Sequence, residues 1–411
     1  MKSTNHNKQP SWIVGPESVR MIELGHPWII ADSYTKRWPA GKPGQLIELT
    51  DEKGRFLATG MLDPNERVVA RLLGRKRISI DKGWITSRLR PAIDIRLQHA
   101  KLAETTAYRL VNAEGDGLPG ITVDRYDTHL MLQLYSEAWR PHLPALTSVL
   151  NELLSPAGIY EKVRPQNTRE LEANSENKKY GRLISGKPAK EPMLVKENGI
   201  SFWVSLEKGL NTGLFLDQRR NRIDLMERVK GKRVLNLFSY TGAFSVAAAA
   251  AGATEVTSVD VSQGYTDWAI RNFELNRINP RQHRFLVGDC LQVLKQLNEQ
   301  RKRFDVVLMD PPSFSTTSKG RFTTKGGTSD LLAAASAILV DGGLMICSSN
   351  HQKVDLADYI KELRKGALQA GCELRVISTL GQPEDFPYPT TFPEGRYLKY
   401  LIMAKIPGGV K

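Results

Sequence analysis

From residue 230 onward, hydrophobic positions recur in short runs, and each run is followed by a stretch with helical spacing. The runs are KRVLNLFSY, TEVTSVD, RFLVGD, FDVVLMDPP, GGLMICSSN and CELRVIST. Alternation of short apolar runs with helices predicts a parallel sheet that is covered by helices on both faces. In the second helix Tyr265, Trp268, Ala269 and Phe273 recur at helical spacing, which predicts that these side chains pack in the core.

The preceding residues show two other patterns. Short strands cut by Gly and Pro, such as GRFLATGMLDP, run to about residue 87 and are typical of a small β-rich module. Beyond it, a helical stretch, a turn in EGDGLPGITVDRY and a hairpin partner HLMLQLY predict a mixed α+β piece. The polar run that starts at Glu161 predicts a long exposed excursion. We therefore expect three domains, at residues 10–87, 88–195 and 196–411.

Composition narrows the class of protein. The chain has 411 residues, of which 41% are hydrophobic and 25% charged, as in ordinary globular proteins. Cys290, Cys347 and Cys372 are far apart and form no CxxC pair, which predicts neither a disulfide framework nor a metal site and favours the cytoplasm. No apolar run reaches the roughly 20 residues of a membrane span, so no membrane role is expected.

The charge points to an acidic partner. The formal net charge is +14, and residues 1–90 hold 16 Lys and Arg against 9 Asp and Glu. Nucleic acid is the commonest acidic partner of such proteins. The basic cluster Arg71, Arg75, Lys76 and Arg77 is therefore predicted to contact RNA phosphates, with a solvated protein surface as the alternative interpretation.

Polar residues follow the predicted strands of the C-terminal sheet. In doubly wound sheets, ligands bind beyond the carboxyl ends of the strands. Asp260 is expected to accept both ribose hydroxyls of a nucleoside, and Asp289 its adenine amino group. The strand-end residues expected to bind a cofactor are Asn236, Phe238, Ser239, Tyr240, Gly242, Asp260, Val261, Ser262, Asp289, Cys290 and Asp310.

A dinucleotide enzyme would use some of these features, but the first loop, NLFSYTGAF, has no GxGxxG. A pyrophosphate needs that glycine pattern to approach a helix N-terminus, whereas an adenosyl group without phosphates does not. The loop therefore favours S-adenosylmethionine (SAM) over NAD. The alternative for Asp260 alone is a helix-capping role.

Several motifs resemble those of one known family. NLFSYTGAF, SVDVSQ, VGDC, MDPPSF and NTGLFLDQRRNR look like the class I methyltransferase motifs of the RlmI family, the bacterial 23S ribosomal RNA cytosine-C5 methyltransferases. The likeness extends to HPWII, YRLVNAEGDGLPGITVDRY and TFPEGRYLK and so covers nearly the whole chain. It implies an N-terminal PUA domain, a central α+β domain, a Rossmann-like methyltransferase domain, SAM as cofactor and 23S ribosomal RNA as partner.

The resemblance also places residues of the NTGLFLDQRRNR motif. Phe215, Asp217, Gln218 and Arg219 would lie near the sulfonium and carboxylate end of the cofactor. A helix cap with a surface arginine is the alternative interpretation.

The run DPPSF predicts a stiff corner after the fourth strand. Pro311 and Pro312 fix φ and remove two amide donors. Such stiffness, next to Asp310, suits an acceptor base that must be held in line with a methyl donor. Phe314 offers a face on which an unstacked base could stack, or else it closes the edge of the sheet.

One position departs from the RlmI pattern. Methylation at cytosine C5 needs a thiolate that adds to the ring, and the matching position here is Ser349. Cys347 lies two residues earlier on the same strand face. Either Cys347 supplies the thiolate, or the target atom is nucleophilic unaided, as guanine N7 or an exocyclic amine is. The run SSN resembles SNN of the guanine-N7 methyltransferase half of RlmKL.

A function of a different class is a ribosome-assembly protein that binds RNA without turnover. The sequence also leaves open whether the chain forms a homodimer.

Overall fold

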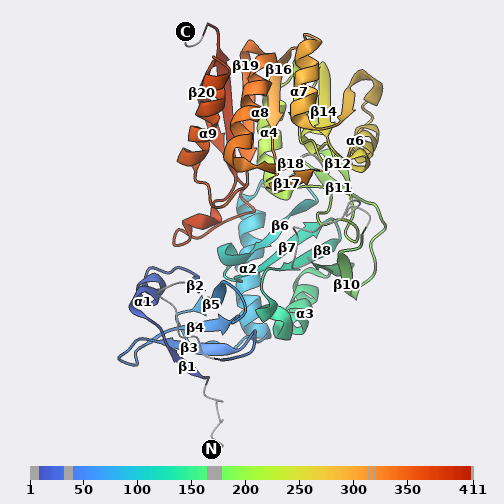
Figure 1. The fold of residues 1–411 in the computed structure, drawn as a ribbon. Coiled ribbons are helices and arrows are strands. Elements are labelled where there is room, and N and C mark those ends of the chain that lie inside the picture. The colour runs from blue at the N-terminus through green and yellow to red at the C-terminus, as the bar shows by residue number, and fades with distance from the viewer. Residues whose placement is uncertain (1–8, 32–39, 164–177, 313, 318–319, 409–411) are drawn as a thin grey trace, which may run out of the picture.

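The computed structural model describes residues 9–31, 40–163, 178–312, 314–317 and 320–408. Its strands form three large sheets that follow one another along the chain. Figure 1 shows the N-terminal sheet in blue at the bottom, the central sheet in cyan and green, and the C-terminal sheet in yellow to red at the top. Within the described ranges, no helix has the length and apolar character that crossing a membrane requires.

The N-terminal sheet has five strands in the order β1-β3-β4-β5-β2, and the predicted β-rich module is confirmed. The elements are β1 (Ser11–Ile13), α1 (Pro16–Glu23), β2 (Trp28–Ile30), β3 (Leu46–Thr50), β4 (Phe56–Leu62) and β5 (Val68–Gly74). Leu49, Ala58 and Ala70 are fully buried in the core of this sheet.

The central sheet has the order β10-β9-β8-β7-β6. Its strands are β6 (Ala107–Asn112), β7 (Ile121–Tyr126), β8 (His129–Leu134), β9 (Gly158–Lys162) and β10 (Gly181–Gly186), and α2 (Lys82–His99) and α3 (Leu143–Leu154) pack against it. The predicted hairpin of HLMLQLY is confirmed, because β8 pairs with β7.

The predicted excursion from Glu161 is partly wrong. Glu161 is fully buried in β9 and forms ion pairs with Arg140 and Arg182, and β10 returns to pair with β9. Residues 164–177 of the predicted excursion lie outside the described residues. The expected boundary near residue 195 falls in β11 (Met193–Glu197), which pairs with β12 (Ile200–Val204). The domain boundaries remain predictions.

The C-terminal sheet has seven strands in the order β15-β14-β13-β16-β19-β21-β20. They are β13 (Arg233–Leu237), β14 (Glu255–Asp260), β15 (Arg284–Val287), β16 (Phe304–Met309), β19 (Leu339–Ser349), β20 (Glu373–Leu380) and β21 (Lys399–Ile406). The expected parallel pairing is confirmed for β13, β14, β15, β16 and β19. The strand β21, which the sequence patterns had not indicated, lies antiparallel between β19 and β20.

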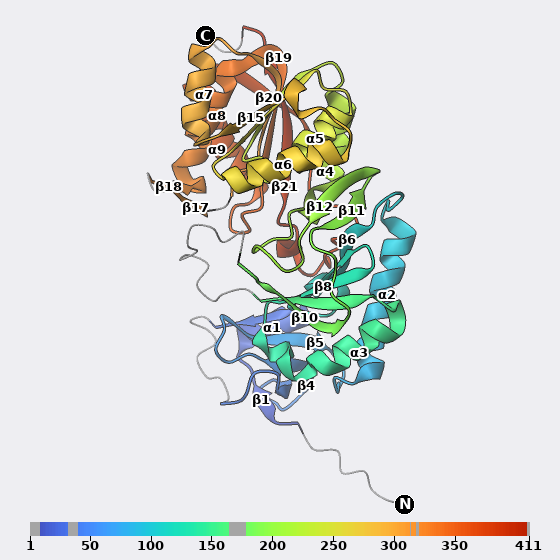
Figure 2. The ribbon, with the colours of Figure 1, turned by 90° about the vertical axis from the view of Figure 1, so that its right-hand side faces the viewer.

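Helices cover both faces of this sheet, as predicted. Figure 2 shows α7, α8 and α9 on one side and α4, α5 and α6 on the other. Their bounds are α4 (Arg219–Arg228), α5 (Ala243–Ala250), α6 (Gln263–Leu275), α7 (Cys290–Glu299), α8 (Thr324–Ile338) and α9 (Leu356–Gln369). The carboxyl ends of the parallel strands face the central domain, and the hairpin β17 (Phe314–Thr317) and β18 (Gly320–Thr323) lies below that edge.

Candidate active site at the carboxyl ends of the C-terminal sheet

The loop after β13 adopts a conformation that most residues avoid. Phe238 and Tyr240 have φ of 57° and 50°, and Gly242 has φ of 77°. A left-handed backbone is costly for bulky residues and persists where the surrounding structure enforces it, often at ligand sites. A Cβ atom at Gly242 would lie 2.7 Å from the Cβ of Ala269, so α6 can pack this closely only against glycine. At Gly242, the backbone of the loop therefore lies against α6 at the edge of the sheet without an intervening side chain.

Asp260, at the end of β14, holds that loop in place. Its Oδ2 accepts a hydrogen bond from the amide of Tyr240 at 2.8 Å, and its Oδ1 accepts one from the amide of Ser262 at 3.0 Å. Each carboxylate oxygen has a second lone pair, which is the acceptor that a ribose hydroxyl requires. Ser262 uses its hydroxyl to cap α6 through the amide of Tyr265. The expected ribose contact of Asp260 remains a prediction.

Asp289 and Cys290 begin α7. Asp289 Oδ1 accepts hydrogen bonds from the amides of Leu291 and Gln292, at 3.0 and 3.1 Å, so this oxygen caps the helix. The Cys290 side chain is 2% exposed and lies in the core, where burial raises the pKa of its thiol. The predicted cofactor contact of Cys290 therefore does not involve its side chain.

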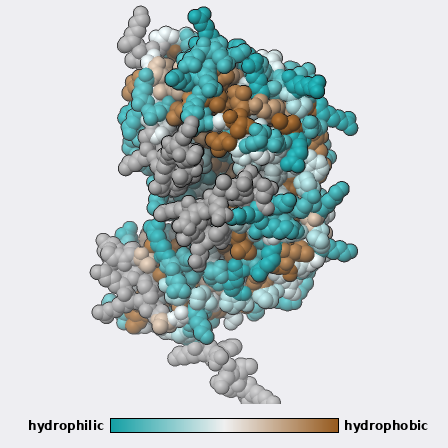
Figure 3. All heavy atoms as spheres, turned by 45° about the vertical axis from the view of Figure 1, so that its right-hand side comes forward, coloured by the Kyte–Doolittle hydropathy of each residue, from teal (hydrophilic) through white to brown (hydrophobic). Residues whose placement is uncertain are grey.

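Exposed apolar side chains accompany the strand-end carboxylates. Val261 is 54% exposed and follows Asp260, and Leu291 is 39% exposed in the first turn of α7. Figure 3 shows hydrophobic surface among hydrophilic surface on the upper half of the molecule. Such surface suits the faces of a purine ring. Leu291 was not among the predicted residues, although an apolar residue in a helix's first turn next to a strand-end acid is a signal that could have identified it.

The side chains of two predicted cofactor residues make contacts within the protein. The side chain of Asn236 is buried in the sheet and donates a hydrogen bond to Ser245 Oγ at 2.9 Å. Arg219 is 1% exposed, and its guanidinium pairs with Asp385 at 2.7 Å and donates to the carbonyl of Lys101. The position of Arg219 near the sulfonium remains a prediction, but its guanidinium is paired within the protein.

Asp310 lies at the corner after β16, and Gln218 fixes its carboxylate. Gln218 Nε2 donates to Asp310 Oδ2 and to Ser348 Oγ, both at 2.9 Å, while its Oε1 accepts from Asn221 at 2.6 Å. Burial, together with the nearby Asp217 carboxylate, raises the pKa of Asp310 to about 6, although hydrogen bonds from Ser348 and Gln218 act to lower it. Asp310 is therefore an oriented, half-buried hydrogen-bond acceptor whose pKa is raised above the usual value of a carboxyl group.

Asp217 and an aromatic cluster lie beside this corner. The hydroxyl of Tyr397 donates to Asp217 Oδ2 at 2.7 Å, and burial raises the pKa of Asp217. Phe215 is 41% exposed, with its ring centroid 5.2 Å from that of Tyr240, whose ring centroid lies 4.5 Å from that of Tyr265.

Four side chains of α6 were predicted to pack in the core. Ala269 and Phe273 are buried there, as predicted, whereas Tyr265 and Trp268 are only partly buried.

The corner DPPSF continues with one buried and one exposed proline. Pro311 is buried and Pro312 exposed. Phe314 belongs to β17, which pairs with β18, and its side chain lies outside the described residues. The stacking role of Phe314 remains a prediction.

The end of β19 carries the two candidates for covalent chemistry. Cys347 is 0% exposed among apolar side chains of the core, and burial raises the pKa of its thiol. Ser349 is 5% exposed, and its Oγ accepts a hydrogen bond from the amide of His351 at 3.4 Å. A buried thiol with a raised pKa is a poor nucleophile.

The predicted phosphate-binding cluster is largely paired within the protein. Arg71 is 6% exposed and pairs with Glu114 of the central domain at 3.3 Å, so the prediction that it contacts RNA is wrong. Arg75 donates to the carbonyls of Ile22 and Glu23 at the end of α1, and Arg77 pairs with Glu48 at 2.8 Å. Arg75, Lys76 and Arg77 are exposed, and their RNA contact remains a prediction.

Comparisons with known proteins bear on this site. A family described as S-adenosylmethionine-dependent methyltransferase matches residues 109–398, and a PUA-like domain matches residues 13–75. YwbD of Bacillus subtilis, named as a ribosomal RNA large subunit methyltransferase, is 34% identical over 93% of this chain and 96% of its own. Ribosomal RNA large subunit methyltransferase I of Enterobacter sp. is 33% identical over 91% of this chain and 94% of its own. The crystal structure of SMU.776 in complex with SAH superposes with a TM-score of 0.87 at 29% identity, covering 97% of this chain and 100% of that one.

Proposed function

Since the chain belongs to the family of S-adenosylmethionine-dependent methyltransferases, with a PUA-like domain at its N-terminus, we propose that it methylates a base in the ribosomal RNA of the large subunit. The relatives named for that activity align over nearly their whole length and over nearly all of this chain. The net charge of +14 fits an RNA partner. The observation that carries the proposal is the position of Asp260, Asp289 and Asp310 at neighbouring strand ends, next to the glycine-poor loop of positive φ.

The residues at this edge fit SAM. Bound SAM supplies an electrophilic methyl group on a sulfonium. Asp260 provides oriented acceptors for a ribose, and the exposed Val261 and Leu291 provide apolar surface for an adenine. The loop from Phe238 to Gly242 lies at the same edge of the sheet and lacks the GxGxxG pattern that a pyrophosphate needs.

We expect replacement of Asp260 by alanine to weaken SAM binding roughly 10- to 100-fold, because a hydrogen bond to a charged group contributes about 1.5–3 kcal/mol. Isothermal calorimetry measures the Kd. The matched control is Asp267→Ala, since Asp267 is exposed on α6 and bonds the side chain of Gln263. An unchanged Kd for the Asp260 variant would contradict the ribose assignment.

The target atom follows from the chemistry that β19 can provide. Attack from cytosine C5 requires prior addition of a thiolate to the ring. The buried Cys347 and the hydroxyl at Ser349 do not offer one. We therefore propose a target atom that is nucleophilic unaided, such as guanine N7 or an exocyclic amine. Cytosine C5, the target in the RlmI family, is the competing candidate.

Nucleoside analysis decides between these targets. Unmodified 23S ribosomal RNA is incubated with the protein and labelled SAM, digested, and separated by mass spectrometry. We expect a methylated guanosine or N-methylated base, and we expect Cys347→Ala to retain the activity to the same extent as Cys372→Ala, the control at a half-buried cysteine. Labelled 5-methylcytidine that disappears only in Cys347→Ala would overturn the proposal.

A further inference from the structure

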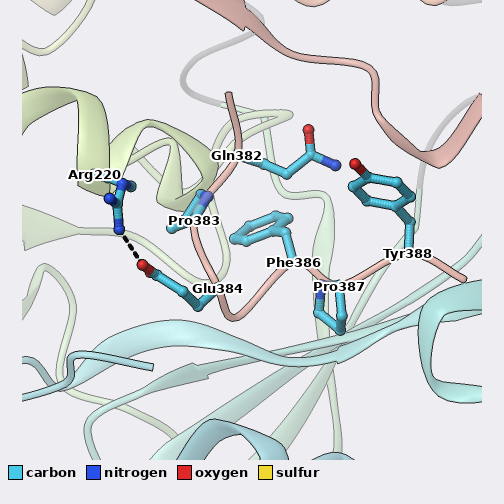
Figure 4. A pocket seen from close by; sticks show the side chains of 7 residues that line it. All are labelled: Arg220, Gln382, Pro383, Glu384, Phe386, Pro387 and Tyr388. Atoms are coloured by element: carbon cyan, nitrogen blue, oxygen red, sulfur yellow. Dashed lines mark hydrogen bonds and ion pairs between the residues drawn. The ribbon is translucent and has the colours of Figure 1, made fainter. Parts of the chain in front are cut away.

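A shallow pocket of about 280 Å³ lies where the segment that joins β20 to β21 meets the start of α4. Arg220 of α4 forms one wall of the pocket. The other walls come from the segment that joins β20 to β21, and they are Gln382, Pro383, Glu384, Phe386, Pro387 and Tyr388. Figure 4 shows the Arg220–Glu384 pair on one side, Tyr388 on the other, and the ring of Phe386 between them. We refer to this hollow as the Phe386 pocket.

The walls of the Phe386 pocket are fixed from behind. The guanidinium carbon of Arg109 lies 4.4 Å from the centroid of the Phe386 ring, which is 2% exposed, and Asn112 donates to the carbonyl of Pro387 at 2.8 Å. Between Glu384 and Phe386, the fully buried Asp385 pairs with Arg219 at 2.7 Å. These contacts hold the pocket in one shape, which lowers the entropy lost when a ligand binds.

The start of α4 connects the pocket with the corner where the target base is expected. Arg220 is two residues from Gln218, which bonds Asp310, so their Cα atoms are at most about 8 Å apart. On the opposite side, Tyr388 lies against Gly395, two residues before the Tyr397 that bonds Asp217. Residues two apart on a helix do not face each other, and Gln218 is 3% exposed whereas the Arg220 side chain is 47% exposed. The Phe386 pocket and the Asp310 corner therefore lie on different sides of the start of α4.

The side chains match the chemistry of a single nucleobase. Tyr388 is 40% exposed and offers a ring face and edge. Arg220 and Glu384 form an ion pair whose side chains remain 47% and 30% exposed, so one donor and one acceptor group are presented together. Unpaired bases in RNA are recognised by stacking on aromatic rings together with hydrogen bonds to their edges. The volume lies at the lower end of small-molecule pockets, which suits one base and not a complete dinucleotide.

We propose that the Phe386 pocket binds one unpaired nucleotide of the RNA substrate other than the target nucleotide, with Tyr388 stacking on the base while Arg220 and Glu384 bond its edge. The proposal rests on the proposed function, because it takes ribosomal RNA as the substrate. It assigns to the segment between β20 and β21 a part in substrate recognition that is separate from SAM binding.

The test compares Tyr388→Ala, Tyr388→Phe and Arg220→Ala with the wild type. Loss of one stacked base is expected to raise the Kd and the KM for an unmodified 23S ribosomal RNA transcript roughly 5- to 100-fold in Tyr388→Ala, with Tyr388→Phe close to wild type. Arg220→Ala is expected to raise both values as well. The matched control is Arg375→Ala, since Arg375 is another exposed arginine paired with a glutamate, Glu373. The Kd for SAM should not change in any variant.

The outcomes separate this proposal from the proposed function. RNA binding is measured directly by filter binding, so the result does not depend on turnover. Wild-type methyl transfer with unchanged RNA Kd in Tyr388→Ala and Arg220→Ala would overturn the pocket and leave the function standing. Weaker RNA binding in these variants but not in Arg375→Ala, with no methyl transfer by the wild type, would support the pocket and contradict the function. An equal loss of RNA binding in Arg375→Ala would show that the effect of Arg220→Ala comes from net charge alone, and it would overturn the proposal for the pocket.

Discussion

Replacement of Asp310 by asparagine is expected to lower kcat for methyl transfer by about 10²- to 10⁴-fold, the usual contribution of a positioned acid or base. Gln218 and Ser348 fix the Asp310 carboxylate at the Pro-Pro corner, where it can accept a hydrogen bond from an N–H group of the target base. Asparagine keeps the shape but loses the charge and presents donors where an acceptor is needed. The Kd for SAM is expected to stay within a few-fold of wild type.

The pH dependence of kcat provides a second readout at the same residue. Burial raises the pKa of Asp310 to about 6, so the carboxylate is protonated below that pH and ionised above it. Activity should therefore rise with pH through about 6 and level off near 7. The acid limb should vanish in Asp310→Asn and persist in Asp305→Asn, a control at the opposite end of β16 that pairs with Arg233. An Asp310→Asn enzyme with wild-type kcat would contradict this role.

The largest effect on stability is expected at Asp385. This residue is 0% exposed, and its carboxylate accepts from the Arg219 guanidinium at 2.7 Å and from the Arg109 amide at 2.9 Å. Its own carbonyl accepts from Arg96, which also pairs with the buried Asp116. Removal of one partner from a buried ion pair costs about 3–5 kcal/mol, because the remaining charge stays buried. Asp385→Ala should lower the free energy of unfolding by that amount.

Urea denaturation followed by circular dichroism measures the change. Glu373→Ala is the matched control, since its partner Arg375 is 64% exposed and exposed ion pairs contribute little. Asp385→Ala is also expected to loosen the two domains, because Arg219 belongs to α4 and Arg96 to α2. A urea midpoint equal to that of the Glu373 control would show that this buried network does not stabilise the protein.

The sequence predicted the parts of the site that depend on local periodicity. Apolar runs followed by acids placed Asp260, Asp289 and Asp310 at strand ends, and the parallel sheet brings those ends to one edge. The antiparallel insertion of β21 was missed, because pairing order depends on contacts between residues far apart along the chain. The residues of the Phe386 pocket were missed because their segment lacks any periodic signal.

The distant ion-pair partners of two arginines could not be predicted from local sequence patterns. Arg71 was assigned to RNA because it belongs to a basic cluster, and Arg219 was assigned to the cofactor because its motif resembles that of the RlmI family. Each has a carboxylate partner in a different part of the chain, Glu114 at 43 positions from Arg71 and Asp385 at 166 positions from Arg219. Only the folded chain brings these charges together, so sequence spacing could not distinguish a buried ion pair from a ligand contact.

The central claim is that SAM bound over the first three strand ends is directed at a base held by Asp310. Transfer of the tritium-labelled methyl group of SAM to unmodified 23S ribosomal RNA tests this claim most directly. We predict stoichiometric labelling by the wild type and labelling reduced at least about 100-fold by Asp310→Asn at saturating SAM. Two results would contradict the claim. One is tight SAM binding with no labelling of either free 23S ribosomal RNA or ribosomal particles, and the other is equal labelling by both proteins.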